Sequence, residues 1–224
     1  MMTAYDESYI ETAQRTLAQM MHFAVYDLEM SYDDYMYLFL VSGVADQFGC
    51  GNPKYIAGMS GTELAREVMS RVSSSEITAE PSSYDSRSDA YWTGHVLAYY
   101  QWRSAESFRV IISGIPASAV AGMYRKYHEM DIRQSVDEID RMRRMAAYQK
   151  MVGLQAVRRA AGLSQRQLAE QSGVPLRSIQ QYEQRQKDLS KASFRTVLDL
   201  ARVLKCAPER LIQAAGVPSD PSAG

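Results

Sequence analysis

The sequence has few of the residues that build covalent or metal-stabilised sites, with two cysteines and three histidines among 224 residues. Cys50 and Cys206 are far apart, and neither has a partner at metal-ligand spacing. No disulfide framework, metal site or cofactor is therefore expected. So little cysteine is typical of a reduced, cytoplasmic setting.

Long hydrophobic runs and alternating strand patterns are also missing. The most apolar stretches, MHFAV and YLFLVSGV, are far shorter than the ~20 residues that cross a bilayer. The first residues are acidic and do not resemble a secretory signal. Apolar residues instead recur every three or four positions, which predicts an all-α protein that does not enter the membrane.

The three histidines do not suggest an enzyme. His22 and His95 lie on apolar or aromatic helical stretches, where packing is the simpler interpretation. His128 has acidic neighbours but no second metal-ligating partner at helical spacing. The GCGNP segment lacks the Lys-Ser/Thr ending of a phosphate-binding loop. An enzymatic N-terminal domain would need a pocket that gathers His95 or His128 with acids, and the sequence offers no sign of one.

Charge is distributed unevenly along the chain. Residues 1–146 hold 13 Lys and Arg against 20 Asp and Glu, a net of -7, whereas residues 147–214 hold 12 against 5, a net of +7. A basic module attached to an acidic body indicates a polyanionic partner for the basic end. The alternative is an uneven scatter of charge without function.

Residues 1–146 are expected to form an acidic helical domain. Ser31 is a candidate N-cap, and Ser60 with Glu63 has the spacing of a capping box. Ser104 is expected to cap a short helix over residues 105–113. The Ser-rich segment 72–88 is predicted to be a loop, and a helix beginning near Asp131 is predicted to run on as a connector through residue 151.

The aromatic stretch AYWTGHVLAYYQW (90–102) allows two interpretations. Its apolar side chains recur at helical spacing, which favours a core helix. Alternatively, they line a pocket for a small effector or contact a partner helix.

The stretch LSQRQLAEQSGVPLRSIQQYE (163–183) predicts two short helices joined at Gly173. Ser164 can cap the first helix, and glycine accepts the positive φ of a tight turn. Val174, Ile179 and Tyr182 would form the buried face of the second helix. Its outer face is polar and rich in glutamine, a pattern typical of a helix-turn-helix that reads base edges in the major groove. The alternative is a helical hairpin that binds protein.

Residues 147–214 resemble the lambda-repressor/Cro-like (XRE) DNA-binding domain. Arg158 precedes GLSQ (162–165), LA (168–169) precedes SGV (172–174), SIQQYE (178–183) precedes a basic loop, and ARVLKCAPERLI (201–212) resembles the fifth-helix region. The resemblance implies five short helices and Arg158–Glu183 as a buried ion pair. The residues after this domain, 215–224, are rich in Pro, Ser and Gly, which predicts a flexible tail. The DNA-binding residues that it implies are Gln165, Gln167, Leu176, Arg177, Gln180, Gln181, Arg185, Gln186, Lys187 and Lys191.

The sequence departs from the XRE pattern at the second helix of the pair. Pro175 stands where a serine often caps this helix, so the capping hydrogen bond is lost. Leu176 replaces a commonly polar base contact and would meet a thymine methyl. Gln184 and Arg185 stand where a glycine often follows.

The N-terminal region is similar to uncharacterised bacterial domains encoded near XRE regulators and toxin–antitoxin genes. The similarity lies in DYMYLFLVSGVADQF, GNPKYIAGMSGTELA, YWTGHVLAYYQWRSAESF and MYRKYHEMDI. It implies an antitoxin-like autorepressor that neutralises a cognate toxin. The leading expectation is a repressor that binds a pseudo-palindromic operator as a homodimer, with helix 175–184 in the major groove and with dimerisation through the N-terminal region.

Overall fold

The computed structural model describes residues 3–73, 78–82 and 88–212, and all regular structure in these ranges is helical. The all-α prediction is confirmed. The contacts divide the chain into two compact units, Met1–Arg143 and Arg144–Gly224. Within the described part of the chain, no helix is long and apolar enough to cross a membrane.

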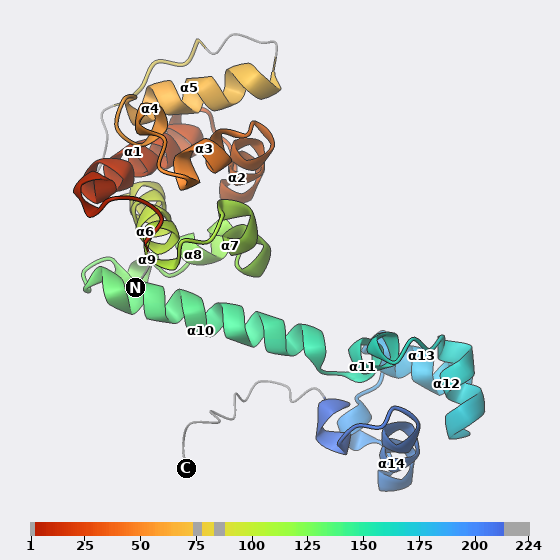
Figure 1. The fold of residues 1–224 in the computed structure, drawn as a ribbon. Helices are drawn as coiled ribbons and strands as arrows, with labels where there is room; N and C mark the ends of the chain where they lie inside the picture. The colour runs from red at the N-terminus through yellow and green to blue at the C-terminus, as the bar shows by residue number, and fades with distance from the viewer. Residues whose placement is uncertain (1–2, 74–77, 83–87, 213–224) are drawn as a thin grey trace. The chain divides into compact units, whose positions relative to one another are not determined.

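The N-terminal unit is built around one buried helix, α1, which spans Ile10–His22 and packs against α5 and α6 (Figure 1). Its other elements surround a single apolar core. In chain order, the elements after α1 are the π-helical turn η2 (Phe23–Asp27), α2 (Tyr32–Val41), α3 (Val44–Gly49), α4 (Pro53–Ile56), α5 (Gly61–Val72), α6 (Asp89–Ser104), α7 (Phe108–Gly114), α8 (Ala117–Ala121), α9 (Tyr124–Tyr127) and α10 (Ile132–Met151); the 3₁₀ turn η1 (Glu7–Tyr9) precedes α1. The residues of α10 from Arg144 on belong to the C-terminal unit.

Two glycines allow α5 and α6 to approach α1 closely. A Cβ atom on Gly94 of α6 would lie 2.4 Å from the carbonyl oxygen of Leu17, and one on Gly61 of α5 would lie 2.5 Å from the amide nitrogen of Met20. Both distances are shorter than van der Waals contact, and both involve backbone atoms of α1. The two crossings therefore require residues without a side chain.

The predicted caps of the N-terminal unit are confirmed with one exception. Ser31 accepts a hydrogen bond from the amide of Asp34, and Ser60 and Glu63 form both bonds of a capping box. The prediction for Ser104 is wrong, because α6 continues through that residue. α7 is capped by Ser107, whose side chain accepts from the amide of Val110.

The aromatic stretch forms α6, and the core interpretation is confirmed. Val96, Leu97 and Tyr100 are almost fully buried. His22 is only 4% exposed and pairs with Ser88, while the ring of His95 contacts the side-chain amide of Gln14 at 2.9 Å. Within the described residues, no three His, Cys, Asp or Glu side chains gather as metal ligands would.

The connector prediction is confirmed by α10, a continuous helix through Met151. Within the predicted loop 72–88, Val72 is the last residue of α5, whereas Ser73 and residues 78–82 are not helical. Residues 74–77 and 83–87 lie outside the described residues. The predicted tail 215–224 also lies outside them.

The C-terminal unit contains short helices around a separate aliphatic core (Figure 1). They are α11 (Leu154–Ala160), α12 (Gln165–Ser172), α13 (Leu176–Glu183), the 3₁₀ turn η3 (Leu189–Lys191), α14 (Phe194–Val203) and the 3₁₀ turn η4 (Pro208–Arg210). Where the resemblance implies a fifth helix, the described residues contain η4 and end at 212.

Candidate nucleic-acid interface

The helices α12 and α13 form the predicted helix-turn-helix. Ser164 caps α12 and exchanges both bonds of a capping box with Gln167. Gly173 ends α12 at φ +70°, a left-handed conformation that favours glycine. Pro175 occupies the N-cap position of α13 without a side-chain hydrogen bond, as the sequence suggested.

Apolar contacts fix α13 against the rest of the unit. Leu168 of α12 and Ile179 of α13 are fully buried, and Val174 in the turn is 7% exposed. Tyr182 is half-buried against the same cluster. Because Ile179 faces the core, residues on the opposite side of α13 face solvent.

Arg158 and Glu183 form the predicted buried ion pair between α11 and α13. The guanidinium Nε and Nη2 donate to the two carboxylate oxygens at 2.6 and 2.9 Å, a bidentate geometry. The side chains are 9% and 0% exposed. Arg158 also donates to the carbonyl oxygen of Leu163 at 2.5 Å, and Gln165 donates to Glu183 at 2.8 Å. One carboxylate thus joins α11, α12 and α13.

The pKa of the Glu183 carboxyl reflects two opposing effects. Burial raises it, but hydrogen bonds from Arg158 and Gln165 and the nearby positive charge outweigh burial and hold the pKa below its usual value of 4.5. The hydrogen bond to Glu183 correspondingly raises the pKa of Arg158. The pair is therefore fully charged at neutral pH.

The predicted base-reading residues share the solvent-facing side of α13. Leu176 and Arg177 are exposed, with Leu176 at 37%, while Gln180 and Gln181 are half-exposed. At 100° per residue, all four lie within about 140° of the helix circumference. The structure thus brings these four side chains together on one face.

The two predicted contacts of α12 have additional structural roles. Gln165 is half-buried, and its amide nitrogen is already bonded to Glu183. The side-chain oxygen of Gln167 accepts from the amide of Ser164 at 2.8 Å. The bonded atom is the amide nitrogen in Gln165 and the amide oxygen in Gln167. The amide oxygen of Gln165 and the amide nitrogen of Gln167 therefore remain for a contact with DNA.

The basic loop after α13 is exposed. Arg185, Gln186 and Lys187 face solvent, and the backbone amides of Gln186 and Lys187 both donate to the carbonyl oxygen of Gln181. Lys191 ends η3 and is also exposed. Arg185 has φ +59°, the left-handed conformation that a glycine at this position would adopt without strain.

Gln184 is the interface candidate that the list of predicted contacts omits. It is exposed, it follows α13 as the C-cap residue, and its side-chain oxygen accepts from Gln186 at 3.0 Å. The sequence places it on the outer face of this helix, between Gln180 and Gln181 around the helix axis, although it is not among the predicted DNA contacts.

Comparison with known proteins agrees with this geometry. Residues 154–211 match the family model of the helix-turn-helix. These residues belong to the XRE-type helix-turn-helix family. A domain of this type supports a DNA-binding regulator of the XRE type. No curated protein and no solved structure matches the chain.

Proposed function

We propose that the chain is a dimeric repressor, acting on its own gene, which inserts α13 into the major groove at each half of a pseudo-palindromic operator. The observation that carries the proposal is the exposed polar face of α13, directly followed by an exposed basic loop. The buried Arg158–Glu183 pair supports it, because it holds α13 in one orientation relative to α11 and α12.

Each residue of the interface has a role that its chemistry supports. Gln180 and Gln181 can each form two hydrogen bonds with adenine, Arg177 can do so with guanine, and Leu176 can contact a thymine methyl. The remaining predicted contacts are assigned to phosphates, which fix the register of the protein on the duplex. They are Gln165, Gln167, Arg185, Gln186, Lys187 and Lys191.

The proposal is tested by selecting genomic DNA fragments with the purified full-length protein at two salt concentrations. We expect enrichment of a pseudo-palindromic site upstream of the protein's own gene, with affinity that falls steeply as salt rises. Enrichment of no sequence at either salt concentration would contradict the proposal.

Two substitutions test the assignment of α13. Arg177→Ala and Gln181→Ala are each expected to weaken binding by about 1–3 kcal/mol and to relax sequence preference at one position. Arg210→Ala is the matched control, because Arg210 is an exposed arginine on η4, outside the helix pair. If both α13 variants bind the selected site as the control does, α13 is not the reading helix.

An antitoxin-like role for the N-terminal unit is the second candidate. It is favoured by an apolar surface on α2, where Tyr37 and Val41, one helical turn apart, are 63% and 47% exposed. Exposed apolar surface of this kind marks protein contacts, and tyrosine is enriched in them. Co-purification of the product of an adjacent gene, lost in Tyr37→Arg but retained in Arg177→Ala, would support this role. Co-purification that persists in Tyr37→Arg would place the partner elsewhere.

A further inference from the structure

Glu183, the last residue of α13, accepts hydrogen bonds from two other helices of the C-terminal unit. Its side chain is fully buried. One carboxylate oxygen accepts from Nε of Arg158 at 2.6 Å. The other oxygen accepts both from Nη2 of Arg158 at 2.9 Å and from the side-chain amide nitrogen of Gln165 at 2.8 Å. The charged pair and the first residue of α12 therefore share one carboxylate oxygen.

The carboxylate determines which end of the Gln165 amide faces it. The pKa of Glu183 lies below its usual value, so the group is charged at neutral pH. An ionised carboxylate only accepts hydrogen bonds, and the amide must therefore present its nitrogen to Glu183. That nitrogen carries two hydrogens, and Glu183 takes one of them. Among the described residues, the Gln165 side chain makes no other hydrogen bond, so the second N–H is left to donate to a ligand.

A DNA phosphate is a suitable acceptor for this second N–H. Gln165 is half-buried at the N-terminus of α12, and helix N-termini and glutamine side chains are among the groups that contact phosphates. A mobile side chain loses rotamer freedom when it binds, which weakens binding. Gln165 has already lost part of this freedom in the protein without DNA, because its amide is bonded to a buried carboxylate.

We infer that Glu183 is a positioning residue for DNA binding that acts through Gln165. Its carboxylate takes one N–H of the Gln165 amide and holds the second N–H of the same nitrogen in place for a DNA phosphate. Arg158 completes the arrangement, because it holds the carboxylate through two hydrogen bonds. The inference rests on the proposed function, and it gives the buried ion pair a part in DNA binding besides the orientation of α13.

Gln167 offers a matched comparison in the first turn of α12. Its amide is also held at one end, but by the backbone amide of Ser164 at 2.8 Å and not by Glu183. Gln165 and Gln167 are both neutral, both are assigned to phosphates, and both lose the amide when replaced by methionine. Removal of the Arg158–Glu183 pair should therefore change what Gln165 contributes to DNA affinity and leave the contribution of Gln167 unchanged.

A double-mutant cycle on DNA affinity tests the inference. The probes are the selected operator and a random-sequence duplex, because a phosphate contact contributes to the binding of both. The pair is removed by Arg158→Met together with Glu183→Met, since a buried ion pair is often replaced as a whole by apolar residues without loss of the fold. Gln165→Met and Gln167→Met are each measured in full-length protein, with and without the pair, at one salt concentration.

The cost of Gln165→Met should depend on the pair. With the pair present, the substitution should weaken the binding of both duplexes about 10-fold. Without the pair it should cost only about 2-fold, because DNA must then order the side chain itself. The cost of Gln167→Met should be the same in both backgrounds. Equal costs of Gln165→Met in both backgrounds, or no cost in either, overturn the inference, and a loss confined to the operator would place Gln165 on a base instead.

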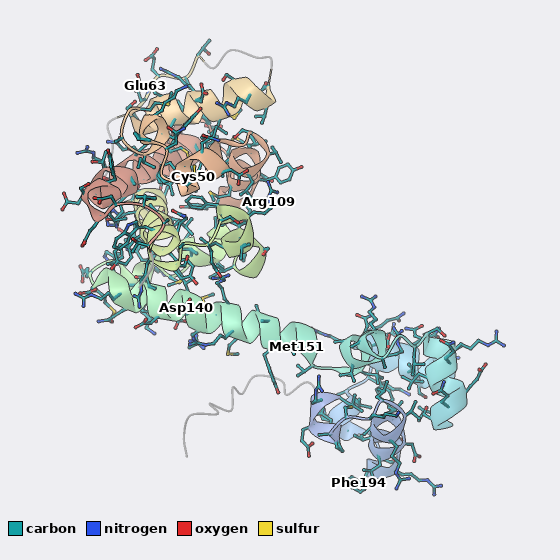
Figure 2. All side chains as sticks on the ribbon, in the orientation of Figure 1. Cys50, Glu63, Arg109, Asp140, Met151 and Phe194 are labelled. Carbon is teal, nitrogen blue, oxygen red and sulfur yellow. The ribbon has the colours of Figure 1, made fainter. Side chains whose placement is uncertain are left out.

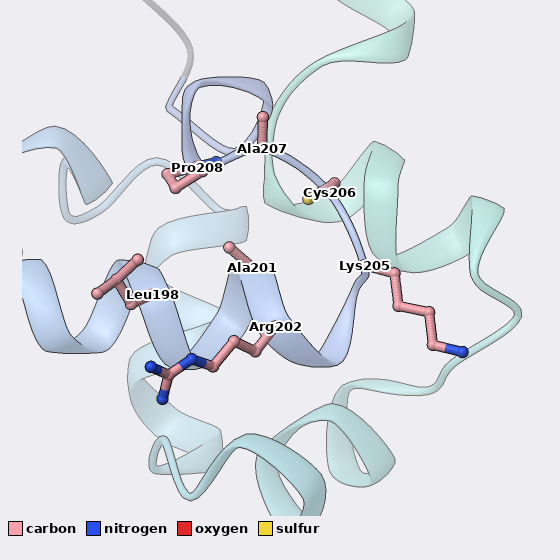
Figure 3. Close-up of a pocket in the computed structure, with 7 residues that line it drawn as sticks. All are labelled: Leu198, Ala201, Arg202, Lys205, Cys206, Ala207 and Pro208. Carbon is pink, nitrogen blue, oxygen red and sulfur yellow. The ribbon is translucent and has the colours of Figure 1, made fainter.

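Cys206 reports whether the C-terminal unit of each variant is folded. It is half-buried in a hollow at the end of α14, beside Leu198, Arg202 and Pro208 (Figure 3). Cys50, which is exposed in the N-terminal unit, is replaced by serine throughout so that one thiol remains (Figure 2). Alkylation of Cys206 as slow as in Cys50→Ser alone shows that the unit is intact.

A measurement on the side-chain amide of Gln165 does not depend on the stability of the paired substitutions. Its two proton signals are assigned as those lost in Gln165→Met. One should be shifted by the carboxylate in the free protein, and the other should shift only when duplex is added. Two protons at the positions of an exposed glutamine in the free protein would overturn the inference.

The outcomes separate this inference from the proposed function. If the wild-type protein binds neither duplex, both fail. If it binds the operator but the cost of Gln165→Met does not depend on the Arg158–Glu183 pair, only the positioning role of Glu183 fails and the repressor proposal stands.

Discussion

The two units use different side chains to hold their helices together. In the N-terminal unit, Phe39, Phe48 and Phe108 pack edge to face with ring centroids 5.3–6.3 Å apart, and four buried methionines belong to the same core. Among the described residues of the C-terminal unit, the buried apolar cluster is aliphatic throughout. In the C-terminal unit, the Arg158–Glu183 ion pair helps to hold the helices together by joining α11 to α13.

The difference follows from size. A unit of about 140 residues can bury enough apolar surface to form a substantial core, whereas a unit of about 80 residues has a much smaller interior. The small unit adds a charged cluster that fixes the orientation of α13, which is the property that base reading requires. We therefore expect the two units to respond differently to loss of packing, loss of charge, and acid.

The largest effect is expected from the aromatic core. Phe108→Ala removes the ring that contacts both Phe39 and Phe48 and should destabilise the N-terminal unit by about 3–5 kcal/mol. Unit-resolved hydrogen exchange should show faster exchange in α1, α2 and α6 and none of this change in α12 and α13. Equal acceleration in both units would show that they unfold as one.

The ion pair provides the matching test in the C-terminal unit. Arg158→Ala leaves the Glu183 carboxylate buried without its partner and should destabilise this unit by about 3–5 kcal/mol. Arg143→Ala is the control, because Arg143 pairs with Glu106 at 2.6 Å but the two side chains are 18% and 38% exposed. Chemical denaturation followed by hydrogen exchange should rank Arg158→Ala well above Arg143→Ala.

The stabilities of the two units should also respond differently to acid. Because the folded pKa of Glu183 lies below its usual value, the pair contributes stability at neutral pH that is lost as pH falls below about 4.5 toward the folded value. Glu183→Gln should remove this part of the pH dependence and leave that of the N-terminal unit unchanged. Thermal unfolding between neutral pH and pH 3 measures it, and an unaltered acid profile in Glu183→Gln would contradict this origin.

The smallest effects concern residues with positive φ. Arg185 and Lys205 adopt left-handed conformations at +59° and +48°. Replacing either with Gly relieves strain but adds freedom to the unfolded chain, so each should stabilise the C-terminal unit by only about 0.5 kcal/mol. Arg185→Gly should also weaken DNA binding. If Lys205→Gly lowers the DNA affinity by the same amount, the result would argue against a phosphate contact by Arg185.

The helix pair could be predicted from the sequence because its signals are local. Ser164 and Gln167 are three residues apart, and Gly173 supplies the turn within the same short segment. The ion pair came from the resemblance to the XRE family. The bond between Gln165 and Glu183 could not be foreseen, because it joins two helices whose packing must be known first.

The error at Ser104 has the same physical origin. Ser104 and Ser107 are equally good capping residues in sequence, and the choice depends on contacts from elsewhere in the fold. The Gln101 amide nitrogen donates to the carbonyl oxygens of Gly49 and Glu106. α6 then ends at Ala105 with φ +54°, a conformation that an alanine gives no reason to expect.

The close packing of α1 against Gly61 and Gly94 limits which substitutions evolution can accept at these two positions. Any larger residue at either position would push a side chain into the backbone of α1, so descent with this fold leaves little choice there. Two glycines separated by 33 positions, the first after a capping serine and the second inside an aromatic helix, form a signature that can outlast most other similarity. Such a signature offers a way to trace the kinship of the N-terminal unit.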